Sequence, residues 1–215
     1  MNYLAVLDYE HMDDGVFLGT LARSIAAHDY SGSILLHGES AYTERIIQTG
    51  VMREDAVIRA HKDLNHRLVA LLADEGVSAT GLNGHRRSLI TLRDGELSLD
   101  RSFLDAMPKE PLLLVSSLAM DTGTGRPVTV NLPRMADFLR EELRPDELFL
   151  FTPSDENEIF TDRFPREDTC WNELSQEQLE FLVPKEFRDY GRPLRLSTAR
   201  DFQKIPDLGP TKALL

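Results

Sequence analysis

Short apolar runs alternate with amphipathic segments along the first half of the chain. Residues 4–7 are apolar throughout, residues 13–29 place apolar side chains three and four positions apart, and residues 34–36 are apolar again. A strand–helix–strand succession with short connections is typical of a parallel βαβ unit, whose crossover is right-handed. The pattern therefore predicts two parallel strands joined by a helix.

The middle of the chain continues this alternation. Residues 88–99 alternate apolar and polar side chains around Asp94 and Gly95, a pair that favours the tight turn of a β-hairpin. Residues 111–120 form an apolar run that we interpret as one buried strand. The other predicted elements are helices at 54–75 and 133–144, strands at 77–82 and 147–152, a turn at 121–126 and extended structure at 127–131.

The C-terminal third has a different texture. After residue 152 the sequence is polar and contains proline, which predicts a long loop. Ser175 and Gln178 form a capping-box pattern for a short helix, and residues 192–198 predict a last strand. We expect a three-layer αβα sandwich with a mostly parallel central sheet and a rim β-hairpin. Residues 1–152 would form this α/β domain, and the divergent residues 153–215 would complete it.

Composition and charge restrict the partners. Apolar residues make up 41% and charged residues 28%, as in an ordinary globular protein. The formal charge of −12 disfavours nonspecific binding to nucleic acid or to anionic membranes, since both require a basic surface. No signal peptide and no membrane-spanning segment is apparent, and the lone Cys170 fits a reducing compartment. The sequence therefore predicts a cytoplasmic protein.

Three longer stretches follow one another in the chain: "LLHGESAYTERI", "LNHRLVALLADEGVSATGLNGHRRSLIT" and "RPVTVNLPRMADFLREELRPDELFLFT". Taken in this order, they resemble the amino-acid kinase family, and acetylglutamate kinase in particular, over roughly residues 3–152. It implies the fold of that family, a cleft over the sheet edge where ATP and acetylglutamate meet, and a homodimer.

The resemblance and the predicted strand ends together nominate site residues at the carboxyl edge of the sheet, where ligands of such folds bind. The phosphate-loop-like candidates are Asp8, Tyr9, His37, Gly38, Glu39 and Ser40; the substrate-binding candidates are Arg53, Gly81, Asn83, Gly84, Thr129 and Asn131; the nucleotide-edge candidates are Thr152, Pro153 and Ser154.

The residues that carry phosphoryl transfer in the family are largely replaced here. The first lysine of the family aligns with Val6, and the glycine pair that follows it aligns with Asp8 and Tyr9. Of the triple-glycine turn only Gly38 remains, and the organising aspartate aligns with Pro133. Because the transition state of phosphoryl transfer is stabilised by positioned N–H donors, lysines and magnesium, these losses predict a large loss of rate.

Glu39 has three readings. It is a solvated turn residue, a carboxylate that satisfies the positive end of a helix, or a catalytic or metal-binding group, and we favour the second. If Asp8, Glu10 and Glu39 converged, they would suit magnesium or calcium, but we predict no metal site. His37 is either a ligand contact or a satisfied, half-buried histidine.

Two function hypotheses follow. The first is a non-catalytic protein that binds a small molecule or regulates an intact kinase or pathway enzyme, without an assigned cofactor. The alternative is an active ATP-dependent kinase of an N-acetylglutamate-like carboxylate in amino-acid or arginine biosynthesis. That alternative requires Mg-ATP, and it requires Arg53, Arg86 or Lys204 to enter the cleft.

Overall fold

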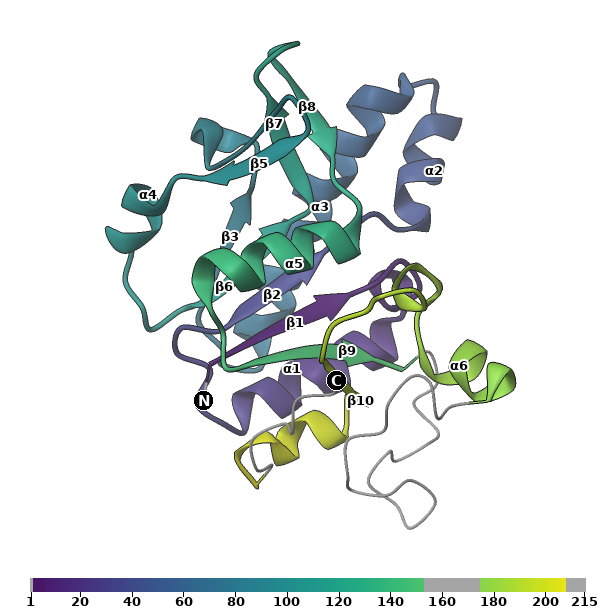
Figure 1. The fold of residues 1–215 in the computed structure, drawn as a ribbon. Helices are drawn as coiled ribbons and strands as arrows, with labels where there is room; N and C mark the ends of the chain where they lie inside the picture. The colour runs from purple at the N-terminus through teal and green to yellow at the C-terminus, as the bar shows by residue number, and fades with distance from the viewer. Residues whose placement is uncertain (1, 153–174, 208–215) are drawn as a thin grey trace.

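The predicted apolar runs form one parallel sheet in the computed structural model, which describes residues 2–152 and 175–207 (Figure 1). Six strands lie in the order β10–β9–β1–β2–β6–β3, and every neighbouring pair is parallel. Their bounds are β1 Tyr3–Leu7, β2 Ile34–His37, β3 Ala79–Asn83, β6 Leu112–Ser116, β9 Glu147–Phe151 and β10 Arg195–Ser197.

Helices cover both faces of this sheet, as the apolar patterns predict. In β1 all five side chains are buried; Tyr3, Ala5 and Leu7 belong to the core that also contains α1 and α3 side chains. The alternate residues Leu4 and Val6 pack in a second core with α5. The predicted three-layer αβα sandwich is therefore confirmed. The helices have the bounds α1 Gly15–Ala26, α2 Ala41–Gln48, α3 Arg53–Asp74 and α5 Leu132–Leu143.

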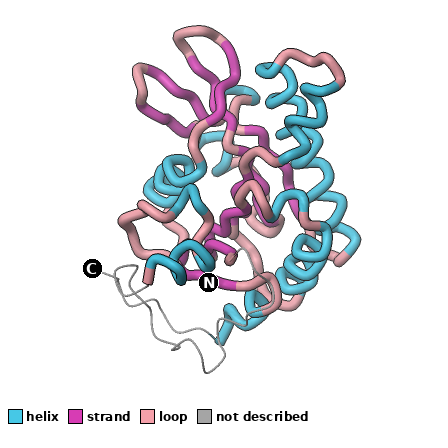
Figure 2. Tube along the Cα trace, turned by 90° about the vertical axis from the view of Figure 1, so that its right-hand side faces the viewer, coloured by secondary structure: helices cyan, strands magenta, loops and turns pink. Residues whose placement is uncertain are grey.

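A second, four-stranded sheet carries the predicted hairpin. Its order is β5–β4–β7–β8, and Figure 2 shows its two hairpins standing away from the rest of the molecule. Asp94 and Gly95 form the predicted turn with positive φ angles of 50° and 84°. The bounds are β4 Ile90–Arg93, β5 Glu96–Leu99, β7 Leu118–Asp121 and β8 Arg126–Thr129, with the short helix α4 Arg101–Asp105, absent from the sequence prediction, after β5.

The prediction of one strand over residues 111–120 is wrong. This run is divided at Ser117 into β6, in the main sheet, and β7, in the second sheet. The Ser117 N–H donates to the carbonyl of His37 at 2.9 Å, and its own carbonyl accepts from Val130 N–H at 2.8 Å. These two bonds hold the chain where it leaves one sheet for the other, and apolar character alone does not reveal such a change.

The described C-terminal residues add to the same sheet. β10 pairs with β9, and the buried Ser24 hydroxyl of α1 donates to the carbonyl of Ala199 at 2.6 Å. The elements here are α6 Gln176–Leu182, the short 3-10 helix η4 Lys185–Phe187 and η5 Asp201–Asp207. The predicted loop over 153–174 and the side chain of Gln178 lie outside the described residues. Within the described ranges, no helix has the length and apolarity needed to cross a bilayer.

Candidate functional site

A cleft of about 430 Å³ opens at the carboxyl edge of the main sheet. Its volume lies within the range of small-molecule sites, and its position is the one expected for a parallel α/β sheet. The chain reaches it just after β1, just after β2, between β6 and β7, and between β8 and α5. Its lining residues are Tyr9, Gly38, Glu39, Ser117, Thr129, Val130, Asn131, Leu132 and Glu186.

Five of the residues nominated from sequence line this cleft together. They come from three separate segments: two follow the parallel strands β1 and β2, and the third leads from β8 of the second sheet into α5. The five are Tyr9, Gly38, Glu39, Thr129 and Asn131.

The turn after β2 approaches α5 very closely. A Cβ atom on Gly38 would lie 2.9 Å from Cδ1 of Leu132, so a larger residue would displace that side chain. Asn131 is the N-cap of α5, where its side-chain oxygen accepts from the Arg134 N–H at 3.2 Å. The Asn131 side chain therefore has a structural role, and its amide NH₂ is the part that remains for a ligand.

The charged groups of the cleft are all acidic. Among the described lining residues, Glu39 and Glu186 are charged and none is lysine or arginine. Burial raises the pKa of Glu39, Arg53 opposes that shift and Glu44 adds to it. Partial burial raises the pKa of Glu186, and the negative charges of Asp8 and Glu39 raise it further. The cleft is therefore an unfavourable place for a triphosphate and a favourable one for a cation.

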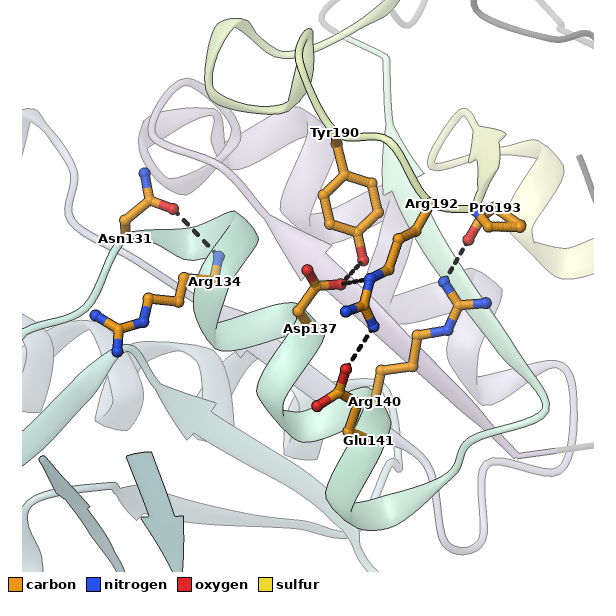
Figure 3. Close-up of polar contacts among 8 residues, drawn as sticks. All are labelled: Asn131, Arg134, Asp137, Arg140, Glu141, Tyr190, Arg192 and Pro193. Atoms are coloured by element: carbon orange, nitrogen blue, oxygen red, sulfur yellow. Dashed lines mark hydrogen bonds and ion pairs between the residues drawn. The ribbon is translucent and has the colours of Figure 1, made fainter. Parts of the chain in front are cut away.

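The segment that carries Glu186 is fastened to α5 by polar contacts (Figure 3). The Tyr190 hydroxyl donates to Asp137, and the Arg140 guanidinium donates to the carbonyl of Pro193 at 2.6 Å. Arg192 lies 3.5 Å from Asp137 and donates to the carboxylate of Glu141 at 2.7 Å. These contacts fix the chain just beyond η4, and so hold Glu186 at the rim of the cleft.

Ser117 connects the cleft to helix α3. Nε2 of His61 lies 3.2 Å from the Ser117 hydroxyl, and Nδ1 of His61 lies 2.9 Å from the carbonyl of Val57. A carbonyl only accepts, so this bond places the ring proton on Nδ1 and leaves Nε2 as an acceptor. The Ser117 hydroxyl therefore donates to His61, and its oxygen lone pairs remain for the cleft.

Behind the cleft, against α3, lies a group of buried polar side chains that we call the polar layer: His37, His61, Asn65 and Ser116. His37 and Ser116 are paired in register at the ends of β2 and β6. The His37 and His61 rings are 5.9 Å apart. Burial, followed by the neighbouring His61, lowers the pKa of His37 to about 3, and burial lowers that of His61 to about 4.

Several atoms of this layer have no hydrogen-bond partner among the described residues. They include Nε2 of His37, Oδ1 of Asn65 and the hydroxyl oxygen of Ser116. Nδ1 of His37 faces the carbonyl of Gly38 at 3.1 Å, so in the neutral ring Nε2 is an acceptor. His37 thus lies directly behind the cleft rather than among its lining residues.

The three substrate-binding candidates at the end of β3 are also outside the cleft lining. A Cβ atom on Gly81 would lie 2.4 Å from Oδ1 of Asn65, and one on Gly84 would lie 2.1 Å from the Leu118 carbonyl oxygen. Both glycines are thus needed for close packing of the strand end. Oδ1 of Asn83 is buried without a partner among the described residues.

Asp8 is held away from the cleft by His11. Its carboxylate accepts from the backbone N–H of His11 at 3.1 Å and lies 2.6 Å from Nδ1 of the same residue. Nε2 of His11 reaches the carbonyl of Thr152 at 2.8 Å, so the His11 ring lies between Asp8 and Thr152. Within residues 2–152 and 175–207, no three His, Cys, Asp or Glu side chains are arranged to hold a metal ion. The convergence of Asp8, Glu10 and Glu39 on a cation is therefore not observed.

The remaining candidates have other roles or positions. Ser40 is the buried N-cap of α2 and accepts from the Tyr42 N–H at 3.1 Å. The exposed Arg53 donates to Glu44 at 2.9 Å, and Lys204 donates to Asp201 at 2.7 Å. Arg86 is exposed after β3 and does not line the cleft. Pro153 and Ser154 lie outside the described residues.

Sequence reasoning missed two polar residues of the cleft, Ser117 and Glu186. Ser117 lies inside an apolar run, where a change of sheet cannot be read from the pattern. Glu186 lies 54 residues beyond Leu132, the nearest other lining position in the sequence, and beyond the part of the chain that the family resemblance covers. A buried strand that contains two adjacent serines, Ser116 and Ser117, was the one available signal.

Solved structures of several kinases share this fold. An isopentenyl phosphate kinase matches with a TM-score of 0.63 at 14% identity, over 99% of this chain and 98% of that chain. N-acetylglutamate synthase from Neisseria gonorrhoeae, solved with coenzyme A and L-arginine, matches with a TM-score of 0.63 at 14% identity. The match covers 98% of this chain and 59% of that chain. Aspartate kinase from Synechocystis matches with a TM-score of 0.57 at 11% identity, over 71% of this chain and 28% of that chain.

These similarities establish an amino-acid-kinase-like fold and nothing more specific, because the identities are low. No protein-family model and no curated protein sequence matches the chain.

Proposed function

We propose that the protein binds a small molecule in the cleft after β1 and β2 without transferring a phosphoryl group. The observation that carries this proposal is the charge of the cleft: its described charged lining residues are Glu39 and Glu186. Kinases of any fold stabilise the transferring group with cations and N–H donors. A cleft with the opposite charge retains the shape of such a site without its chemistry.

The cations required by the kinase alternative support the same conclusion. Arg53 pairs with Glu44 outside the cleft, and Lys204 pairs with the fully buried Asp201. Moving Lys204 into the cleft would break its ion pair with a buried carboxylate. Of the three cations considered, Arg53 alone acts on Glu39, whose pKa it lowers against the effect of burial.

A binding protein of this kind would act as a sensor or as a regulatory partner. Two of the proteins with this fold are, by their names, an N-acetylglutamate synthase and an aspartate kinase. We therefore propose a regulatory role beside an intact kinase or pathway enzyme, such as one of arginine biosynthesis, and a homodimeric assembly. Light scattering during gel filtration would test the dimer directly.

The decisive experiment measures binding and turnover separately. Mg-ATP and N-acetylglutamate are titrated into the protein by calorimetry, alone and together, and acyl-phosphate formation is followed with hydroxylamine. We expect no acyl phosphate and no ATP-dependent heat. Turnover that is lost in Arg53→Ala would overturn the proposal and establish the kinase. Arg59→Ala is the matched control, because Arg59 is an arginine of α3 that pairs with Asp63 and does not line the cleft.

A further inference from the structure

We propose that the ligand of the cleft is a small organic cation, a protonated amine or guanidinium on a short apolar body. This inference rests on the proposed binding function and names the class of ligand. It is carried by four features of the cleft: the fixed polarity of Ser117, the two carboxylates, one aromatic ring, and an apolar wall.

Ser117, one of the lining residues, supplies an acceptor to the cleft. Its proton is directed to Nε2 of His61, because Nδ1–H of that ring already donates to the carbonyl of Val57. The hydroxyl oxygen is therefore oriented with its lone pairs available to a donor. A ligand group that presents N–H bonds satisfies this oxygen, whereas a carboxylate or phosphate oxygen does not.

Glu39 and Glu186 add two further sets of acceptors, contributed by two segments that are far apart in the sequence. Both lie among its lining residues, one after β2 and the other in η4. Neither carboxylate makes an ion pair with a lysine or arginine that lines the described part of the cleft. An ammonium group near both carboxylates would supply the missing positive charge. Its attraction to them becomes stronger as the ligand displaces water from the cleft.

Tyr9 and two aliphatic residues shape the rest of the site. The Tyr9 ring is 43% exposed at the cleft, which is unusual for a large side chain that could pack into the core. Aromatic faces attract organic cations. Val130 and Leu132 provide an apolar wall for the body of the ligand.

The polar layer directly behind the cleft has the same excess of acceptors. His37 directly precedes Gly38 of the cleft and is fully buried. Its Nε2 atom has no hydrogen-bond partner among the described residues. Oδ1 of Asn65 is also an unpartnered acceptor, since its amide group already donates to the carbonyl of Leu82 at 3.2 Å. Buried acceptors without donors are costly, so this region favours donor-rich groups.

The test uses three probes of equal length and different charge: n-pentylamine, n-pentanol and pentanoate. Two-dimensional amide NMR spectra are recorded during titration of each probe into the full chain, with agmatine as a guanidinium probe. We expect the amine and agmatine to shift the resonances of Gly38, Glu39 and Asn131. The alcohol should bind more weakly, and pentanoate should not bind. The response to the amine should weaken as salt is added.

Variants assign the effect to the proposed groups. Glu39→Gln and Glu186→Gln should each weaken amine binding about fivefold or more, since each removes one charge at contact distance without changing shape. Ser117→Ala should weaken it too. The matched controls are Glu110→Gln, at the opposite edge of the sheet before β6, and Ser78→Ala, which deletes an exposed serine hydroxyl just before β3, outside the cleft lining. Both should bind the amine as the wild type does.

Two results would overturn the inference. One is tighter binding of pentanoate than of the amine in the cleft, which would leave the proposed binding function standing and reverse the ligand class. The other is the absence of shifts at the cleft with both the amine and agmatine. Failure of the proposed function itself has a different signature, namely acyl-phosphate formation from Mg-ATP.

Discussion

Two regions packed against the same face of the main sheet are built from opposite chemistry. Under β1 and β9 lies an aromatic cluster, Tyr3, Phe149, Phe151 and Phe202, whose fully buried rings meet edge to face with neighbouring centroids 5.1 to 6.1 Å apart. Under the carboxyl ends of β2 and β6 lies the polar layer of His37, His61, Asn65 and Ser116. Each region is as buried as the other, yet only the second contains polar atoms without partners among the described residues.

The difference separates what stabilises the fold from what serves the site. Aromatic rings gain from burial and from their edge-to-face geometry. Burial of polar atoms without partners costs free energy, so we interpret the polar layer as part of the site rather than as a source of stability. The polar layer lies against Gly38 and Ser117 of the cleft, and the aromatic cluster lies farther along the sheet. The stability of the fold should therefore depend on the aromatic cluster. Ligand binding and the dependence of stability on pH should depend on the polar layer.

The largest effect is expected in the aromatic cluster. Phe202→Ala removes the ring that contacts Tyr3, Phe149 and Phe151 at the centre of the cluster. We expect the free energy of unfolding to fall by about 3 to 5 kcal/mol, as for other buried phenylalanines. Urea denaturation measures this loss from the midpoint and slope.

Phe103→Ala is the matched control, because it deletes a phenyl ring from a half-buried position in α4. This variant should lose much less free energy of unfolding than Phe202→Ala. If both variants lost the same free energy, the contrast between the aromatic cluster and the rest of the core would be wrong.

The next effect is a fall of stability in acid that arises in the polar layer. His37 and His61 have pKa values lowered to about 3 and about 4 from 6.5, so the unfolded chain binds protons that the folded chain does not. Their contribution to stability is complete above pH 6.5 and is lost as the pH falls, toward 4 for His61 and toward 3 for His37. Each histidine should add about 1.4 kcal/mol per pH unit to the slope within this window.

The slope is measured by urea denaturation at a series of pH values. His37→Gln should flatten it by about the share of one histidine. Two further groups with lowered pKa values, His28 and His85, contribute to the background of both proteins. His66→Gln, which changes an exposed ring on α3, should leave the slope unchanged. An unchanged slope in His37→Gln would show that His37 is accessible to protons in the folded state.

The same contrast explains which features the sequence could predict. Apolar runs such as residues 4–7 determine that a strand is buried, and the family resemblance supplies the order of the elements; together they predict the parallel sheet and its carboxyl edge. Tyr9, Gly38 and Asn131 could be assigned to the cleft because each follows a strand or precedes a helix. The site candidates at the end of β3 followed the same rule and yet face the close packing of Asn65 and Leu118 instead.

What could not be predicted depends on contacts between distant segments. The run over residues 111–120 is uniformly apolar apart from Ser116 and Ser117, and its division between two sheets depends on bonds to His37 and Val130. Glu186 joins the cleft through contacts of its segment with α5, which no local pattern encodes. The polar layer was predicted only in part, since His37 was a candidate from the sequence and its neighbours in space were not.

The smallest predicted effect distinguishes two buried serines. The Ser24 hydroxyl donates to the Ala199 carbonyl at 2.6 Å, whereas the Ser116 hydroxyl has no partner among the described residues. Ser24→Ala should therefore destabilise the protein by about 1 kcal/mol, because it leaves a buried carbonyl unpaired. Ser116→Ala should leave the free energy of unfolding unchanged or raise it by up to about 1 kcal/mol, because it removes a buried hydroxyl without a partner. Urea denaturation of both variants at neutral pH makes the comparison, and a loss in Ser116→Ala equal to that in Ser24→Ala would mean that the polar layer is internally satisfied.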